Sequence, residues 1–447
     1  MKKIGFFVLI ISACVLSGCL HEEKDVFGEP AAIRMQKVIA EHIKLLTSAE
    51  NGWYADLYPE SNHSIGGYAM YFKFTSDMKV SVGCEIATNA PARELRTSEW
   101  DVIAEQGPVL SFCTYNPVMH YFSEPYAADV DGRRSDYEFV IEKVTNDRID
   151  LKGKKHGNMM ILRRNTGNVA PATYFTGVAA TADRLSEFGM FSFVLNGNRI
   201  GVTSVVDRTF TISYTELDEQ KNEVAKTVKI AYTFTPTGIR LYEPFEFREV
   251  TMESFDWKVS EEKYVCPEAG VNAFFDVYFP ADYQLRYGEF IGTWDITFHG
   301  VSTTTFETFT ATIVEKKKNA TLQFICDDIF SFPGFEVTFN AQKGIISILN
   351  QNAAIQEETG YFIRLCSYDR AAGYLTTGST GPIGIVGIWN KDEGGVRKIN
   401  FVDNGSWGTY KANGFLLRLF NSANTSMGNF TENKHDYRFN DITITKK

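Results

Sequence analysis

An acidic segment in the first third of the chain carries the side chains best suited to hold a metal ion. Its carboxylates are those of Asp129, Asp131, Asp136 and Glu138. A hard cation such as calcium prefers several oxygen ligands, and Gly132 would let the loop fold back around it. The EF-hand pattern is not met, because Arg133 takes its fifth position and Val140 its twelfth. We therefore favour a polar hairpin tip, expect no metal and no other cofactor, and keep calcium as the alternative.

His120 is the histidine whose position most suggests chemistry. It lies between Met119 and Tyr121 in an aromatic run, where it could act as a general base or contact a ligand. The sequence identifies no partner that would activate it, and a hydrogen-bonded histidine beside a sheet is the commoner arrangement. We assign no catalytic residue, and we name His120, Tyr121 and Trp100 as candidates for ligand binding.

The common catalytic motifs are absent from the sequence. It contains no Gly-x-Ser-x-Gly elbow, no His-Glu-x-x-His zinc helix, no phosphate-binding glycine loop and no Cys-x-x-Cys pair. A site assembled from distant strands would leave no local pattern, so an enzyme stays open. The aromatic content of 14% invites a sugar platform, but phenylalanine supplies 35 of these residues and mainly indicates a β-sheet core.

The start of the chain has the pattern of a lipoprotein signal. Lys2 and Lys3 form a charged region, residues 6–15 an apolar core, and residues 16–19 the lipobox Leu-Ser-Gly-Cys. The apolar run is shorter than the roughly 20 residues of a spanning helix. We expect residues 1–18 to be removed and a lipid such as palmitate to be attached to Cys19.

The residues after Cys19 bear on localisation. Residues 21–25 read His-Glu-Glu-Lys-Asp, an acidic run that resembles the export tag of surface lipoproteins in Bacteroides-type bacteria. A solvated linker has the same composition, so a periplasm-facing anchor stays open. We expect a lipid-anchored protein of the outer membrane, displayed at the cell surface.

The composition is typical of an exported globular protein. Its 447 residues are 44% hydrophobic and 22% charged, enough for a large core and for several domains of roughly 100 to 200 residues each. The formal charge of -10 becomes -12 once Lys2 and Lys3 are removed. This acidity argues against a nucleic-acid partner, which would demand basic side chains.

Five cysteines remain after the leader and the lipidated residue are set aside. They are Cys84, Cys113, Cys266, Cys326 and Cys366. An odd number at wide spacing does not describe a disulfide scaffold, although Cys84 could pair with Cys113, or Cys326 with Cys366, in an oxidising compartment. We favour buried thiols.

Apolar periodicity predicts two helices and many strands. The helices are predicted at residues 29–48 and 171–188, each with a proline near its first turn. Alternating side chains predict strands from residue 68 onward, with a hairpin formed by residues 137–144 and 148–151. Residues 107–125, which contain His120, combine two turn signals with an apolar and an aromatic run, and predict another hairpin.

The first two-thirds of the chain are interpreted as a tandem duplication. Residues 70–82 match residues 190–202 at an offset of 120, and Pro117 matches Pro236 at an offset of 119. After Gly292-Thr293-Trp294, which resembles the opening of lipocalin-like barrels, evenly spaced strands follow. The predicted fold is mainly β (α+β), with two helix-plus-antiparallel-sheet repeats and a C-terminal lipocalin-like barrel or sandwich. The expected segments are a signal peptide at 1–18, an acidic tether at 19–28, repeats at 29–165 and 166–280, and an all-β region at 286–447.

Several short motifs together resemble one protein family. They are Gly52-Trp53, Gly66-Gly67-Tyr68, the stretch 107–125, residues 136–139 and residues 151–155. The sequence resembles an uncharacterised family of Bacteroides-type outer-membrane lipoproteins, classed as a domain of unknown function, over roughly residues 27 to 260. The resemblance implies an accessory of a starch-utilisation-type nutrient importer, and it supplies no catalytic residues.

The sequence therefore favours a surface-anchored, non-catalytic lipoprotein that binds a nutrient ligand, a carbohydrate or a peptide, or an importer partner. The alternative is an exported hydrolase with a carboxylate and histidine site that no motif reveals. His120 beside acidic side chains in one cleft would favour the enzyme. A shallow aromatic patch or an apolar barrel cavity would favour binding.

Overall fold

The computed structural model describes residues 29–125, 130, 132–300, 305–378, 380–390, 395–430 and 438–447. The chain divides into two compact units. The first comprises residues 1–61 and 70–169, and the second residues 62–69 and 170–447. Within the described residues, no helix has the length and apolar character needed to cross a membrane. Cys19 and the acidic tether lie outside the described residues.

Both predicted helices are confirmed, as α2 (Ala31–Thr47) and α3 (Pro171–Glu187). Pro30 precedes α2 and Pro171 opens α3, where the missing amide hydrogen costs no hydrogen bond. A short third helix, α4 (Tyr287–Phe290), precedes the C-terminal strands. Apart from one short 3-10 helix, the remaining described elements are antiparallel strands, so the predicted mainly β fold is also confirmed.

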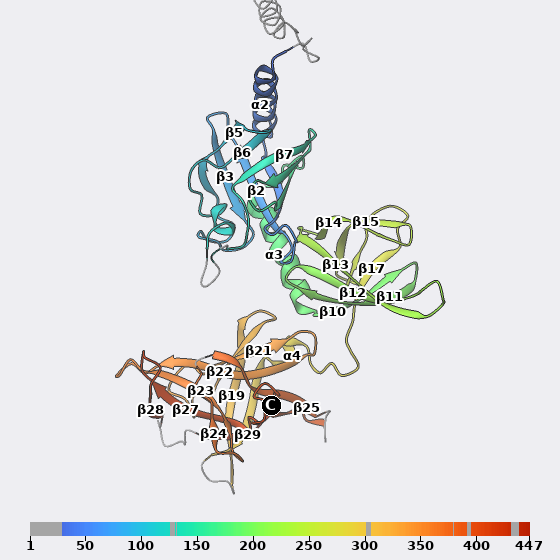
Figure 1. The fold of residues 1–447 in the computed structure, drawn as a ribbon. Helices are drawn as coiled ribbons and strands as arrows, with labels where there is room; N and C mark the ends of the chain where they lie inside the picture. The colour runs from blue at the N-terminus through green and yellow to red at the C-terminus, as the bar shows by residue number, and fades with distance from the viewer. Residues whose placement is uncertain are drawn as a thin grey trace, which may run out of the picture. The chain divides into compact units, whose positions relative to one another are not determined.

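The first unit holds a nine-stranded sheet, in the order β4-β3-β2-β1-β9-β8-β7-β6-β5. Figure 1 labels strands β2, β3, β5, β6 and β7 of this sheet. Only Trp100 separates the edge strands β4 and β5, so one kinked strand joins both edges and the sheet closes on itself as a first barrel. The strands are β1 (Trp53–Tyr58), β2 (Tyr68–Phe74), β3 (Lys79–Cys84), β4 (Arg96–Glu99), β5 (Asp101–Ala104), β6 (Pro108–Ser111), β7 (Glu138–Val144), β8 (Arg148–Gly153) and β9 (Met159–Arg164).

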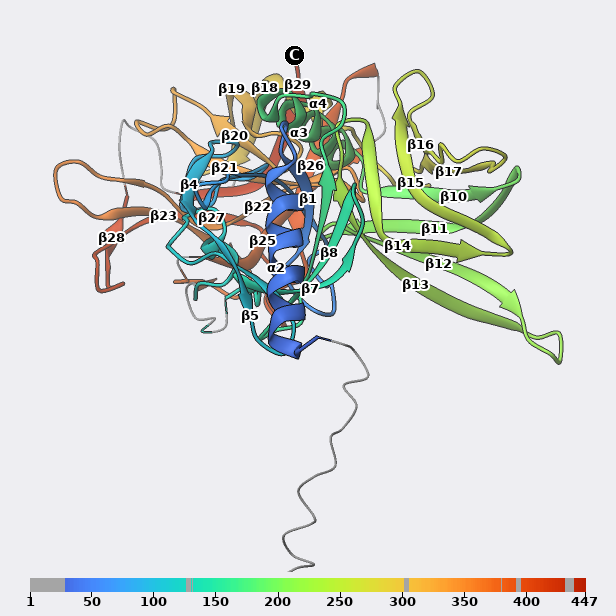
Figure 2. The same ribbon diagram turned by 90° about the horizontal axis from the view of Figure 1, so that it is seen from above.

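A second barrel follows α3 and is closed by the pairing of its first and last strands, β10 and β17. Each strand pairs with the next along the chain, and β12 and β13 form a long hairpin (Figure 2). The strands are β10 (Met190–Leu195), β11 (Asn198–Val206), β12 (Thr209–Leu217), β13 (Glu223–Phe234), β14 (Gly238–Phe247), β15 (Val250–Lys258), β16 (Lys263–Val265) and β17 (Ala273–Val277).

The two barrels repeat one order of elements, which supports the interpretation of a tandem duplication. In each, a helix of 17 residues precedes a meander of neighbouring strands. If β4 and β5 count as one kinked strand, α2 and α3 contact equivalent strands, β5 and β6 in the first barrel and β13 and β14 in the second. This correspondence places β1 on β10. The sequence offset of 120 aligns β2 and β3 with β10 and β11. It therefore differs by one strand from the correspondence that the structure shows.

The predicted hairpin at residues 107–125 is wrong in its second half. Its first run forms β6, but β6 pairs with β5 and β7 instead. The side-chain oxygen of Asn116 accepts hydrogen bonds from the amides of Val118 and Met119, and the His120 amide donates to the Asn116 carbonyl. These local bonds favour a helical turn over a strand. His120 to Phe122 accordingly form a 3-10 helix.

The C-terminal strands form one twelve-stranded sheet in which eight strands close a cycle, β18-β19-β20-β21-β22-β25-β26-β29, completed by the pairing of β29 with β18. We call this cycle the third barrel; β23 and β27 bridge β22 to β29, and β24 and β28 flank them. The strands are β18 (Gly292–His299), β19 (Phe306–Lys317), β20 (Thr321–Ile325), β21 (Phe335–Asn340), β22 (Ile345–Ile355), β23 (Phe362–Asp369), β24 (Tyr374–Leu375), β25 (Thr380–Asn390), β26 (Lys398–Asp403), β27 (Gly414–Phe420), β28 (Ser426–Asn429) and β29 (Arg438–Lys446).

Trp294 anchors the core of the third barrel. Its side chain is fully buried, its indole N–H donates to the Phe290 carbonyl at 2.7 Å, and the Lys446 ammonium lies 4.7 Å from its ring centroid. An internal cavity beside Ile296 and Phe439 measures only about 10 Å³, about the room of one water molecule. In that region side chains fill the interior, so it offers no lipocalin-like ligand cavity.

No disulfide joins any of the five described cysteines to another. Four thiols are buried, as expected, whereas Cys113 is exposed. Burial raises the pKa of Cys366 to about 12 and that of Cys326 to about 11. These buried thiols therefore remain protonated at neutral pH and act as small core side chains.

Candidate functional site

Trp100 is a structural residue in the kinked strand between β4 and β5. Its side chain is buried, its indole N–H donates to the Lys79 carbonyl at 3.1 Å, and its ring meets Phe74 edge-on at 4.7 Å. A tryptophan buried in this way contributes to stability through its area and its satisfied N–H group. It leaves no exposed ring face for a ligand.

Asp136 and Glu138, the two residues of the calcium candidate that the structure describes, already bind other groups of the protein. The carboxylate of Asp136 accepts the amides of Lys155 and His156 at 3.1 and 2.8 Å, and Glu138 pairs with Lys154 at 3.0 Å. Asp129 and Asp131 lie outside the described residues. Among the residues that the structure covers, no group of three or more His, Cys, Asp or Glu side chains is placed to hold a metal ion.

His120 is held at the first turn of the 3-10 helix by the residues around it. Its Nδ1 accepts the backbone N–H of Asn116 at 3.2 Å. Its ring stacks on Tyr137 at 4.8 Å with an interplanar angle of 16°, and lies 5.2 Å from the ring of Tyr115. The neighbouring Tyr121 is half-buried, and the Arg133 guanidinium covers one of its faces at 4.2 Å. Because its Nδ1 is engaged as an acceptor, His120 is fixed in orientation.

Tyr115, His120 and Tyr137 form a group that we call the aromatic cluster. Tyr115 is 57% exposed and Tyr137 is 45% exposed. The amide nitrogen of Asn89 donates to the Tyr115 hydroxyl at 3.1 Å and to Glu124 Oε2 at 2.6 Å. The cluster thus combines exposed rings with an amide and a carboxylate, but Glu124 is bound by Asn89 instead of His120.

The titration of His120 predicts a loss of stability in mild acid. Burial, the largest cause, lowers the pKa of His120 below its ordinary value of 6.5, and it also lowers the pKa of His63 and His42. The unfolded chain then binds more protons than the folded chain as the pH falls below about 6.5. We expect the melting temperature to fall between pH 7.5 and pH 5.5, and to fall less in His120→Gln. An equal fall in both proteins would assign the effect to other groups.

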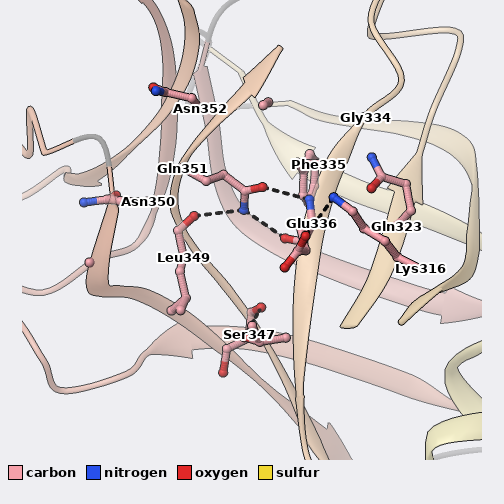
Figure 3. Close-up of a pocket in the computed structure, with 13 residues that line it drawn as sticks. Lys316, Gln323, Gly334, Phe335, Glu336, Ser347, Leu349, Asn350, Gln351 and Asn352 are labelled. Carbon is pink, nitrogen blue, oxygen red and sulfur yellow. Dashed lines mark hydrogen bonds and ion pairs between the residues drawn. The ribbon is translucent and has the colours of Figure 1, made fainter. Parts of the chain in front are cut away.

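A polar groove lies on the outer face of the third barrel, where β21 and β22 separate. They pair only through the last three residues of β21, Thr338 to Asn340, and the first three of β22, Ile345 to Ser347. From Gln351 onward β22 pairs with β23 instead, while its pairing with β25 runs from Ser347 to Gln351. This change of partner leaves an open groove of about 380 Å³ (Figure 3).

Strand alternation places polar side chains in the groove. The side chains that face inward on β20, β21 and β22 as far as Ile348 are apolar and buried, whereas most of their neighbours in sequence face outward, toward the groove. The Lys316 ammonium forms an ion pair with the Glu336 carboxylate at 2.7 Å. Because the pair is half-exposed, it contributes about 0 to 1 kcal/mol to stability. The lining residues are Lys316, Gln323, Gly334, Phe335, Glu336, Thr338, Ser347, Leu349, Asn350, Gln351, Asn352, Ala353 and Gly381.

Gln351 takes the place of the missing strand pairing. Its side-chain oxygen accepts the Glu336 amide at 2.8 Å, and its side-chain nitrogen donates to the Glu336 carbonyl at 2.8 Å (Figure 3). These are the two hydrogen bonds that a residue of a neighbouring antiparallel strand would make. The groove therefore already holds one peptide-like group against the edge of β21.

Two further amides leave polar atoms open to the groove. Gln323 donates its amide nitrogen to the Pro333 carbonyl at 2.8 Å, which leaves its oxygen to accept. Asn352 accepts the Arg364 guanidinium at 2.7 Å, which leaves its amide nitrogen to donate. Neither a histidine nor a cysteine is among the described residues that line the groove, and the carboxylate of Glu336 is paired with the Lys316 ammonium.

Sequence reasoning did not find the groove. The signal that could have marked it is the run Asn350-Gln351-Asn352, which interrupts the apolar alternation of a strand with three consecutive amides. These three residues line a groove only because β22 pairs with β23 and β25, and both strands follow later in the chain.

Fold and sites together define a mainly β protein of closed antiparallel barrels that carries an exposed aromatic cluster and an open polar groove. The chain belongs to the family described as "Domain of unknown function (DUF4302)", whose model matches residues 23–259. The expected membership of an uncharacterised domain family is thus confirmed, with nearly the expected limits. No curated protein and no solved structure matched the chain.

Proposed function

We propose that the protein is a lipid-anchored, non-catalytic binding protein of the outer-membrane surface, which captures a nutrient as an accessory to an importer. The groove of the third barrel carries this proposal. Its lining offers amides and one ion pair, groups that bind and orient a ligand. Because the groove is open to solvent, a bound ligand can leave it again and be transferred to the importer.

A peptide is the ligand class that the groove favours. The Gln351 side chain shows that the edge of β21 accepts an amide group through both the N–H and the carbonyl of Glu336. Main-chain hydrogen bonds to an exposed strand edge are a general mode of peptide recognition. Gln323 and Asn352 add one acceptor and one donor at the rim, which a peptide backbone can use.

The test of this proposal is a thermal-shift titration of the chain from residue 27 with neutral hexapeptides. A ligand that binds only the folded chain adds about 2.7 kcal/mol of stability at one hundred times its Kd. We expect a peptide-dependent rise in melting temperature that the double variant Gln323→Ala, Asn352→Ala reduces.

The matched control is Gln220→Ala, which removes an exposed glutamine from the turn between β12 and β13. It should keep the full peptide response. If the groove variant and the control respond alike, the groove is not the peptide site, and if no peptide shifts the intact chain, peptide capture is rejected.

A further inference from the structure

The aromatic cluster lies in a connection that the barrel fold does not require. In the first barrel, residues 112–137 connect β6 to β7, and this connection contains Tyr115, His120 and Tyr137. In the second barrel, only Arg248 and Glu249 connect the equivalent strands β14 and β15. Binding residues are often held on loops above a rigid scaffold. The long connection is therefore an addition to a complete barrel.

The exposure of the cluster sets it apart from the other aromatic side chains of this barrel. Among the described aromatic residues of the first unit, Tyr115 and Tyr137 are the exposed ones, and the rest are buried or half-buried. Two large rings that both contact His120 and are left exposed forgo part of the stabilisation that burial of their apolar area would give. Such exposure marks an interaction surface.

The cluster is held rigid before any ligand arrives. His120 is fixed between the two tyrosines by its bond to the Asn116 amide, and Asn89 bridges the Tyr115 hydroxyl and Glu124. Groups already ordered in the free protein lose little conformational entropy on binding. A tyrosine also offers a large contact area with few rotatable bonds.

The chemistry of the cluster identifies the ligand. The apolar part consists of ring faces, whose negative potential attracts polarised C–H groups. The polar part consists of the Asn89 side-chain oxygen and the Glu124 carboxylate, which accept hydrogen bonds from hydroxyl groups. A pyranose ring presents C–H groups on its faces and hydroxyl groups around its edge, and so matches both parts.

We propose that the aromatic cluster is a carbohydrate-binding platform. A neutral sugar ring stacks on the exposed tyrosine faces, and its hydroxyl groups donate to Asn89 and Glu124. The platform adds a second ligand class to the proposed binding function, and its residues belong to the first barrel, whereas those of the peptide groove belong to the third.

The experiment is isothermal titration of the full-length protein with neutral hexasaccharides of glucose, mannose, xylose and galactose. We expect at least one to bind, and Tyr115→Ala and Tyr137→Ala each to weaken it about tenfold, the effect of losing about 1.4 kcal/mol of ring contact. Tyr137→Phe keeps the ring and should retain binding. Because both tyrosines are exposed, the variants should keep the wild-type melting temperature.

Two controls separate this inference from the proposed function. Tyr374→Ala removes an exposed tyrosine of β24, which flanks the third barrel, and should leave sugar binding unchanged. The groove variant Gln323→Ala, Asn352→Ala should lose peptide but not sugar. Failure of all four sugars to bind, or binding unaffected by both tyrosine variants, overturns the platform while the peptide result still decides the groove.

Discussion

Replacing Trp294 by alanine should lower the free energy of unfolding of the third barrel by about 3 to 5 kcal/mol, the usual loss for a fully buried tryptophan. Three contributions disappear together. The core loses the largest side chain at this end, the Phe290 carbonyl loses its indole donor, and the Lys446 ammonium loses the ring beneath it. Urea titration of the purified protein, followed by circular dichroism, measures the loss.

Trp407→Ala is the matched control for this prediction. Trp407 belongs to the same barrel but is only half-buried, and its ring lies 5.4 Å from Tyr410 near the surface. Its removal should cost clearly less than the removal of Trp294. Equal losses for the two tryptophans would mean that Trp294 does not anchor the core.

Replacing Cys19 by alanine should move the protein from the membrane fraction to the soluble fraction. This expectation follows from the proposed lipid anchor, because the thiol is the attachment point of the acyl chains and a polar protein has little affinity for a bilayer without them. Cell fractionation followed by immunoblotting gives the answer as a change of compartment.

Cys14 supplies the control within the same leader. It lies in the apolar core of the proposed signal, which is cleaved before the mature protein is released. Cys14→Ala should therefore remain at the membrane. If Cys19→Ala also remained there, the lipid tether would be rejected, whatever the ligand experiments show.

Elements governed by local pattern were predictable from the sequence. The apolar stripes of α2 and α3 and the prolines at their starts mark both helices, and the hairpin of β7 and β8 follows from alternation and a polar turn. Strand β1 was missed, because side-chain alternation predicts strands only from residue 68 onward. Its first residue, Trp53, donates to the Leu46 carbonyl of α2, and the strand pairs with β9.

Sites governed by distant contacts were not predictable. His120 was named as a candidate, but its stacking on Tyr137 depends on a residue 17 positions later, at the edge of β7. In residues 107–125 the sequence predicts a hairpin, yet the Asn116 side chain captures the amides of Val118 and Met119 and diverts the chain. A propensity pattern does not register such a competition between side chain and strand partner.

Each of the three barrels begins and ends on hydrogen-bonded neighbours: β1 pairs with β9, β10 with β17, and β18 with β29. A module whose two ends emerge side by side can be inserted into a chain, or excised from it, through short joins that leave its own strand pairings intact. The family match ends at residue 259, ahead of β18. The third barrel and its groove therefore have the connectivity of a module that can be gained or lost at its two adjacent ends with its own strand pairings intact.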